Sequence, residues 1–423
     1  MKDLLTRGSI PILLGTGGVG KTTIAAALAL AGASAGLNTA VITVDPSERL
    51  RDALGLARLG GQPTRIGRRQ LAGAGLDPNL QLSAMMLDVG GAWDAIIERF
   101  VADPKMRRAV FENPFYKSLT AEFAGSEAFA ALQRLYDLHQ TGAFELEVVD
   151  TPPASHSFEF LQTPARMIRL LDSRTARWLF APSLSMGRIA MKVASETARF
   201  VVRELERFAG GNVLSTISDF FAAMAESMDA IVDRLHKTEA LLHSPSVKFV
   251  MVTTAEPDRI RQARELVAQM ESEGLKLSAI VINRFLDERT FRETALAVRE
   301  SSTIADSGAR PLSHLAEISE LRASIAKDGA EANGFGRLVD HFEEYRDRTL
   351  GEIERVAAFA RELPSGVKLA VAPEIEAGVR DLAALSRVAG YVTGGTAILK
   401  PLESAARAVV GGKQKQNRQS RAE

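Results

Sequence analysis

A glycine-rich run near the start of the chain has the residue types that bind a nucleoside triphosphate. Residues 15–23 read GTGGVGKTT, which satisfies the pattern G-x-x-x-x-G-K-[ST]. Glycines let successive backbone N–H groups point at phosphate oxygens without obstruction by side chains. Lys21 is expected to reach the β- and γ-phosphates, and the Thr22 hydroxyl to hold Mg²⁺. The predicted loop consists of Gly15, Thr16, Gly17, Gly18, Val19, Gly20, Lys21, Thr22 and Thr23.

The segments on either side of this run are those that a phosphate-binding loop requires. The apolar segment Ile10–Leu14 precedes it and has the composition of a buried strand. The alanine-rich segment Thr23–Ala31 follows it and has the composition of a helix. Because a chance match seldom lies between a strand and a helix, the sequence predicts a site for ATP and Mg²⁺.

Three polar residues at the ends of later apolar segments can complete this site. Asp45, followed by the rigid Pro46, can face the γ-phosphate and orient an attacking water. Asp150 ends an apolar strand and can fix the waters around Mg²⁺. The amide of Asn283 can pair with the adenine edge. Each residue type is also common in turns, but their order after the loop favours one shared site.

Strand and helix patterns alternate along the chain, which predicts an α/β fold with a mainly parallel sheet. The stronger strand candidates end at Gly, Asp, Asn or Pro, and ligands bind at those ends in open α/β sheets. The candidate strands are Ile10–Leu14, Thr39–Val44, Leu80–Met86, Leu146–Asp150, Val247–Thr253, Ser278–Asn283 and Val367–Ala372.

Two stretches without strand patterns, about 92–143 and 164–242, predict helical insertions in one P-loop domain that covers 1–393. Apolar residues from Val213 to Leu235 recur at helical spacing and predict one amphipathic helix, and a similar stripe begins at Met186. Their methionines and phenylalanines can line a groove for apolar ligands or simply pack a helical subdomain. Residues 334–362 predict one long charged helix or a helix pair. The tail 394–423 is Gly/Ala-rich and then basic, and it is predicted to be flexible.

Composition narrows the possible functions. The 423 residues include 52 basic, 52 acidic and no cysteine residues, so disulfides, thiolate metal sites and thiol catalysis are excluded. The balanced charge argues against nucleic acid as the partner. The uncharged run 22–44 is long enough to resemble a membrane span, but glycine and polar residues interrupt it. Since the N-terminus also has no secretory signal pattern, we expect a cytoplasmic protein.

The chain resembles the ArsA family of arsenite-pump and tail-anchored-protein-targeting ATPases, a branch of the deviant-Walker ATPases that includes MinD and ParA. Asp45-Pro46 matches the switch I of that family. Residues 150–164 read DTPPASHSFEFLQTP and are similar to its switch II signature D-T-A-P-T-G-H-T-x-x-x-L-x-x-P. Asn283 matches the adenine-contacting asparagine, and residues 371–375 and 379–382 resemble the closing strand and adenine loop.

The resemblance implies a dimer with ATP between the subunits, in which hydrolysis rearranges helical subdomains that bind cargo. Asp45 would activate the water and Lys21 would hold phosphate. Thr22 and Asp150 would serve Mg²⁺. Pro373 would belong to the segment around the adenine.

The chain also departs from the family pattern. The family has a second lysine directly after the first glycine of the loop, where this chain has Thr16. That lysine reaches the neighbouring subunit, and added cations of this kind are worth about 10³–10⁵ in rate in related phosphoryl-transfer systems. Three interpretations follow: slow hydrolysis, substitution by another basic residue, or pairing with a lysine-bearing paralogue. The C-x-x-C zinc clasp of the tail-anchor branch is absent.

Three functions follow from these observations. The leading hypothesis is a Mg-dependent ATPase whose nucleotide state switches a homodimer or heterodimer and gates binding of a hydrophobic client or membrane protein. The alternative is a slow or non-catalytic subunit that pairs with a lysine-bearing paralogue. A positioning ATPase that acts on membrane or DNA has only the basic run 413–421 in its favour. An anion-pump subunit is disfavoured, because arsenite and antimonite need thiolates.

Overall fold

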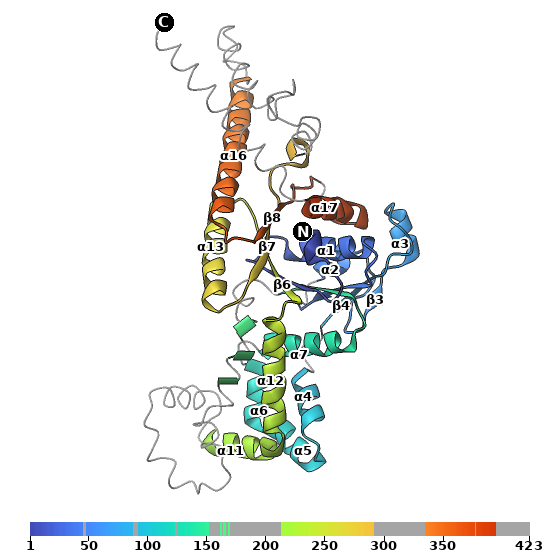
Figure 1. The fold of residues 1–423 in the computed structure, drawn as a ribbon, viewed down its shortest axis with the longest axis vertical. Coiled ribbons are helices and arrows are strands. Elements are labelled where there is room, and N and C mark those ends of the chain that lie inside the picture. Colours follow the sequence, from blue (N-terminus) through green and yellow to red (C-terminus); the bar gives the residue numbers. More distant parts are fainter. Residues whose placement is uncertain are drawn as a thin grey trace.

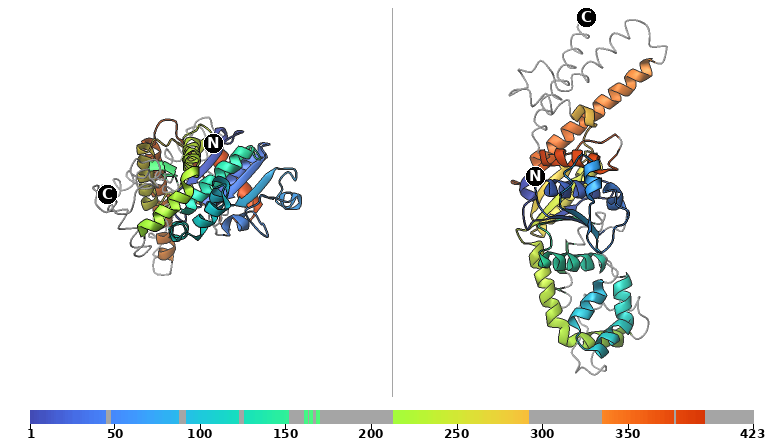
Figure 2. Two further views of the ribbon diagram at one scale, coloured as in Figure 1. Left: turned by 90° about the horizontal axis from the view of Figure 1, so that it is seen from below. Right: turned by 90° about the vertical axis from the view of Figure 1, so that its right-hand side faces the viewer.

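The computed structural model describes residues 1–44, 48–87, 92–122, 126–151, 161–162, 164–165, 168–169, 213–291, 335–376 and 378–394. Within these ranges the molecule has a central sheet with helices on both faces (Figure 1). A group of helices extends from one end of this body, and the long helix α16 (Phe335–Glu362) projects from the other (Figure 2). The predicted α/β fold is therefore confirmed.

The sheet places the predicted phosphate loop at its centre. Its described strands have the order β3-β4-β2-β5-β1-β6-β7-β8, and every pair is parallel except β3 with β4. Ile12 of β1 lies opposite Val149 on one side and Phe249 on the other. The strands are β1 (Ile10–Leu14), β2 (Thr39–Thr43), β3 (Thr64–Arg65), β4 (Leu82–Met86), β5 (Leu146–Asp150), β6 (Val247–Thr253), β7 (Leu277–Ile282) and β8 (Lys368–Val371).

The strand predictions are confirmed to within one or two residues at their ends, and β3 was missed. Three predicted strands, β1, β5 and β6, have the same bounds in the structure as in the prediction. Both faces of the sheet are covered, so the central parallel strands are mostly apolar and are easy to recognise. Thr64 and Arg65 of β3 pair antiparallel with β4 at the sheet edge and have no apolar pattern of their own.

Two hydrophobic layers enclose the sheet. Alternate residues of β1 point to opposite layers, with Ile12 in one and Leu13 in the other. The Leu13 layer contains α1 (Lys21–Ser34), α2 (Arg49–Ala53), α3 (Arg68–Gly73) and α17 (Leu382–Gly394). The Ile12 layer contains residues of α7 (Ser126–Thr141), α12 (Met228–Leu242), α13 (Pro257–Ser272) and α16.

The uncharged run 22–44 forms most of α1 and all of β2. Small alanines let α1 approach β5 and α17 closely, so most of this helix is buried. No helix among the described residues combines the length and the hydrophobicity that a bilayer-spanning helix needs.

The first predicted insertion is helical, as expected, and packs with the described part of the second. The helices are α4 (Ala92–Phe100), α5 (Pro104–Glu112), α6 (Pro114–Glu122), α7, α11 (Val213–Met224) and α12. Buried Phe220, Met224 and Leu235 share a hydrophobic core with Ile97 and Tyr116. These positions therefore pack the helical subdomain, which is the second of the two interpretations given above. Met186 and its neighbours lie outside the described residues.

The prediction of one helix from Val213 to Leu235 is wrong. A short 3-10 turn, η3 (Ala225–Ser227), separates α11 from α12. Ser227 Oγ donates to the carbonyl oxygen of Phe100 at 2.6 Å, so a tertiary contact holds the break in place. By contrast, α16 is a single helix rather than a pair. The predicted tail lies outside the described residues except for Gly394, and the domain limits stay a prediction.

Candidate nucleotide-binding site

The phosphate loop joins the end of β1 to the start of α1, as predicted. Its first and last motif glycines are required by packing. Gly15 has φ +148°, and a Cβ there would lie 2.2 Å from the carbonyl oxygen of Val252. Gly20 has φ +90°, and a Cβ there would lie 2.3 Å from Asn283 Nδ2. The loop is therefore in close contact with Val252 of β6 and with Asn283, which follows β7, and these contacts fix its shape.

Lys21 lies over the loop that precedes it. Its Nζ donates to the carbonyl oxygens of Gly15 at 2.9 Å and Thr16 at 3.3 Å, and the residue is only 7% exposed. The ammonium group is thus held at the concave side of the loop, where a triphosphate would bind. A buried cation beside backbone N–H groups provides the field that attracts phosphate.

Three strand ends meet beside the loop on its β5 side. Asp150 ends β5, is 1% exposed, and accepts a hydrogen bond from Thr43 Oγ1 of β2 at 3.2 Å. Thr151 Oγ1 donates to the carbonyl oxygen of Leu13 at 2.5 Å. The carboxylate predicted to serve Mg²⁺ therefore lies on the strand adjacent to the phosphate loop.

The donors on this side fit a magnesium ion. Thr22 and Asp150 offer hydroxyl and carboxylate oxygens, the ligand types that this hard cation prefers. No group of three or more acidic, His or Cys side chains that could hold a metal exists among the described residues. Mg²⁺ usually binds through one or two protein oxygens and completes its shell with water and substrate phosphates, so a larger cluster is not needed.

Asn283 follows β7 and holds the loop from the opposite side. Its Nδ2 donates to the carbonyl oxygen of Val19 at 2.8 Å, and the residue is 6% exposed. Its backbone N–H donates to Thr253 O at 2.7 Å. Sequence reasoning assigned this amide only to adenine and missed its contact with the loop. The adenine contact stays a prediction, as does the role of Pro373, which is buried two residues after the end of β8.

A cavity of about 620 Å³ opens over the loop. Of the predicted residues, Gly17, Gly18, Gly20, Lys21, Thr22 and Thr23 line it. Thr151 also lines this space, on the side where β5 ends. Gly15, Thr16, Val19, Asp150, Asn283 and Pro373 are not among the lining residues. Asp150 directly precedes the lining residue Thr151, and the others support the loop and the adjoining strand ends rather than the cavity surface.

Three arginines that the motif analysis did not select also line this cavity. They are Arg49 at the start of α2, Arg284 directly after Asn283, and Arg380 before α17. All three are exposed, and none forms an ion pair with another described residue. Asp52 is the one acidic lining residue that the structure describes there, and Arg51 neutralises it at 2.7 Å. The cavity therefore has an excess of positive charge, which suits a triphosphate.

Some predicted residues cannot be placed. Asp45 and the rest of 45–47 lie outside the described residues, as do 152–160 with most of the segment similar to switch II. The water-activating role of Asp45 stays a prediction.

Comparison with known proteins agrees with this geometry. The family model for anion-transporting ATPases (ArsA) matches residues 10–303. A protein of Prosthecochloris vibrioformis with the provisional name arsenical pump-driving ATPase is 26% identical over 281 residues, covering 64% of this chain and 60% of that protein. ATPase GET3 of Malassezia globosa is 24% identical over 272 residues, covering 64% of this chain and 71% of that protein. The chain thus spans less than two thirds of the length of the first of these relatives.

Proposed function

This chain belongs to the ArsA family of anion-transporting ATPases, and we propose that it binds Mg·ATP in the 620 Å³ cavity and hydrolyses it. The observation that supports this proposal best is the loop between β1 and α1, with Lys21 held over it and arginines around its opening. Membership in the family also agrees with the motif resemblance found in the sequence.

The predicted site residues have distinct parts in the proposed reaction. Backbone N–H groups of Gly17, Gly18 and Gly20, together with Lys21, bind and neutralise the phosphates. Thr22 and Asp150 would hold Mg²⁺, which supplies a charge that neutralises oxygens of the β- and γ-phosphates. Asp45 orients the water that attacks the γ-phosphorus. The leaving group is ADP, whose developing charge the loop N–H groups stabilise.

The cavity supports one of the three interpretations of Thr16. Thr43 of β2 lies opposite Asp150 of β5. Because α2 begins shortly after β2, Arg49 lies on the same side of the loop as Asp150, the predicted metal ligand. Arg284 and Arg380 come from the opposite, β7–β8 side. We therefore favour Arg49 as the basic residue that replaces the lysine, because an arginine supplied within the same chain serves this role in some phosphoryl-transfer proteins.

Steady-state ATP hydrolysis by the isolated chain tests this proposal. Lys21→Ala should abolish measurable turnover and weaken Mg·ATP binding, and Arg49→Ala should lower kcat by about 10³-fold with little change in Kd. Arg69→Ala is the matched control, because Arg69 is exposed on α3 and does not line the cavity. If Mg·ATP produces no heat in calorimetry, ATP binding is refuted. If Arg49→Ala turns over like the control, only the role of Arg49 is refuted.

We further propose that the nucleotide state switches a dimer and gates binding of a hydrophobic client or membrane protein. The family resemblance supports this proposal, and the helical subdomain is joined to the sheet through α7 and β5, beside Asp150. The client would have to use residues outside the described core, such as Met186. Mass photometry with ATP and with ADP tests the dimer, and equal affinity of an apolar helical peptide in both states would refute the gating.

The alternative is a slow subunit that pairs with a lysine-bearing paralogue. Thr16 favours it, since a hydroxyl group cannot stabilise the charge that develops on the γ-phosphoryl group. Robust turnover by the isolated chain would eliminate this alternative, whereas turnover only after mixing with the paralogue would support it.

A further inference from the structure

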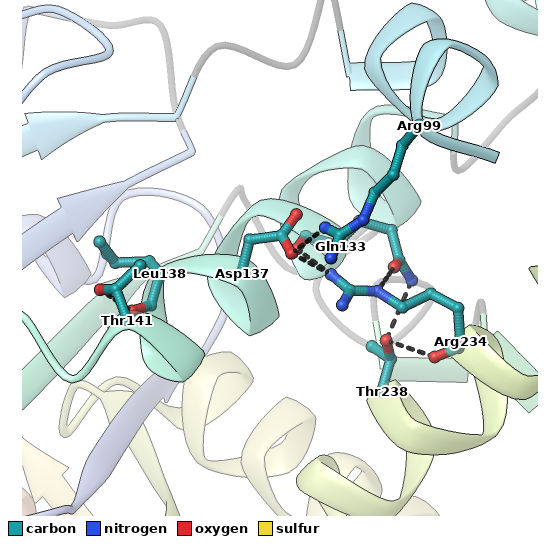
Figure 3. A network of polar contacts seen from close by, with 7 residues as sticks. All are labelled: Arg99, Gln133, Asp137, Leu138, Thr141, Arg234 and Thr238. Atoms are coloured by element: carbon teal, nitrogen blue, oxygen red, sulfur yellow. Dashed lines mark hydrogen bonds and ion pairs between the residues drawn. The ribbon is translucent and has the colours of Figure 1, made fainter. Parts of the chain in front are cut away.

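A second, smaller cavity lies between α4, α7 and α12 and shares no lining residue with the nucleotide cavity. Its volume is about 220 Å³. Its polar wall consists of Arg99, Arg134, Arg234, Asp137 and Gln133, and its apolar wall is formed mainly by Ile96 and Phe100 of α4. Figure 3 shows that Arg99 of α4 and Arg234 of α12 converge at Asp137 of α7.

The positions of two arginines are fixed by contacts with α7. Arg234 donates through Nε to Gln133 Oε1 at 2.8 Å and through Nη2 to Asp137 Oδ1 at 2.6 Å. Its guanidinium carbon also lies 4.0 Å from the ring centroid of Tyr136. Arg99 donates through Nη1 to the same Asp137 Oδ1 at 2.7 Å. The two guanidinium groups therefore share one oxygen of one carboxylate (Figure 3).

Among the described residues, the lining of this cavity has hydrogen-bond donors that lack acceptors, and it has more positive than negative charge. Arg234 is fixed and its side chain is only 11% exposed, yet its Nη1 has no acceptor among the described residues. Arg134 forms no hydrogen bond or ion pair with any described residue. The lining contains three guanidinium groups and one carboxylate, which is an excess of two positive charges.

We propose that this cavity binds a small oxyanion, a phosphate or a carboxylate. The forked N–H groups of a guanidinium match the paired oxygens of either ligand, which explains why arginine is used at such sites. The volume suits a small ion and is below the size of typical pockets for larger ligands. An interhelical salt bridge alone would account for Arg99, Asp137 and Arg234, but it gives no role to Arg134.

In this arrangement Asp137 and the ligand compete for the same guanidinium groups. The carboxylate occupies one donor of Arg99 and one of Arg234. A bound oxyanion would use their remaining donors together with Arg134. Neutralising Asp137 should therefore strengthen oxyanion binding, whereas a purely structural role predicts no such gain.

Calorimetry on the full chain tests the proposal. Inorganic phosphate and butyrate are titrated separately at constant ionic strength in chloride buffer. Saturating Mg·ADP occupies the phosphate loop, and a Lys21→Ala background provides a second way to remove that site. Arg134→Gln should weaken binding about tenfold, the usual effect of losing a charge-assisted hydrogen bond. Arg108→Gln is the matched control, because Arg108 lies on α5 with its side chain 81% exposed and outside the cavity.

The outcomes are distinct. Weaker binding in Arg134→Gln, unchanged binding in Arg108→Gln and a severalfold tighter Kd in Asp137→Asn would support the site. Phosphate binding alone or butyrate binding alone would identify the kind of ligand. No heat with either ligand, or equal affinity of Arg134→Gln and the unmodified chain, would overturn it. Since Arg134 has no partner in the described fold, its replacement can be tested even if Asp137→Asn does not fold. ATP binding at the loop is measured separately and does not depend on this result.

Discussion

The contact between Asn283 and the phosphate loop yields the sharpest prediction. Asn283 Nδ2 donates to the Val19 carbonyl oxygen at 2.8 Å, and it occupies the space that the absent side chain of Gly20 leaves open. The contact joins two residues that are 264 positions apart in the chain. It therefore fixes the loop against the end of β7.

Asn283→Ala removes the amide donor of a buried carbonyl group. Leaving a buried acceptor without its donor costs about 1–3 kcal/mol. If the loop loses that much of its fixed shape, the affinity for phosphate falls by about 5- to 150-fold. Asn283→Asp should be worse at neutral pH, because a carboxylate would face the Val19 carbonyl oxygen.

Calorimetry with two ligands separates the two roles of this amide. If Asn283 shapes the loop, its replacement weakens both Mg·ATP and Mg·tripolyphosphate, which has no base. If it contacts only adenine, the affinity for tripolyphosphate stays unchanged. Asn79→Ala, on an exposed turn before β4, is the control. Wild-type affinity of Asn283→Ala for tripolyphosphate would refute the argument from loop shape.

Three further predictions follow from the loop and the strands beside it. Thr16→Lys should leave kcat unchanged, because Arg49 is proposed to supply the charge already, and a rise of up to about 10³-fold would show instead that a missing cation limits turnover. Gly15→Ala should lower the free energy of unfolding in urea by about 2–5 kcal/mol, because the new Cβ meets backbone, whereas Gly36→Ala, with open space around it, should cost about 1 kcal/mol. Burial of Glu147 in β5 raises the pKa of its carboxyl group above the ordinary value, although His139 Nδ1 at 3.0 Å opposes the shift. When the folded state raises the pKa of an acid, the free energy of unfolding falls as pH rises through that pKa. Glu147→Gln should therefore have a free energy of unfolding about 1 kcal/mol higher than the unmodified chain at pH 8. This difference should shrink toward pH 5.

The sequence predicts the centre of this molecule better than its periphery. The strands β1, β5 and β6 are recognisable because burial on both faces makes them mostly apolar, with few charged residues such as Glu147 and Lys248 within them. The loop is recognisable because its glycines and Lys21 follow a fixed spacing. By contrast, β3 depends on pairing with β4, and the turn between α11 and α12 depends on a contact with Phe100. Neither feature has a local pattern.

Sites built from distant residues were missed for a related reason. Arg49 belongs to no motif that the sequence analysis weighed, and Arg380 lies in the segment 379–382 but was not selected as a site residue. The sheet nevertheless brings the segments after β2 and β8 to one cavity. Arg234 meets Asp137 across 97 residues of sequence. Spacing along the chain cannot show such pairs, because only the packing of α7 between the sheet and α12 places them together.

The two proposed sites are joined by one helix and one strand. Asp137 lines the small cavity from α7, and His139, two residues further along the same helix, contacts Glu147 of β5. Three residues later, β5 ends at Asp150 beside the phosphate loop. This strand is buried along its whole length and paired with β1 and β2 on its two sides, so it can shift only as a unit. A displacement of Asp150 when Mg·ATP binds would therefore also displace the contact with α7. By linkage, any effect of ATP on oxyanion affinity must then be matched by an equal effect of the oxyanion on ATP affinity.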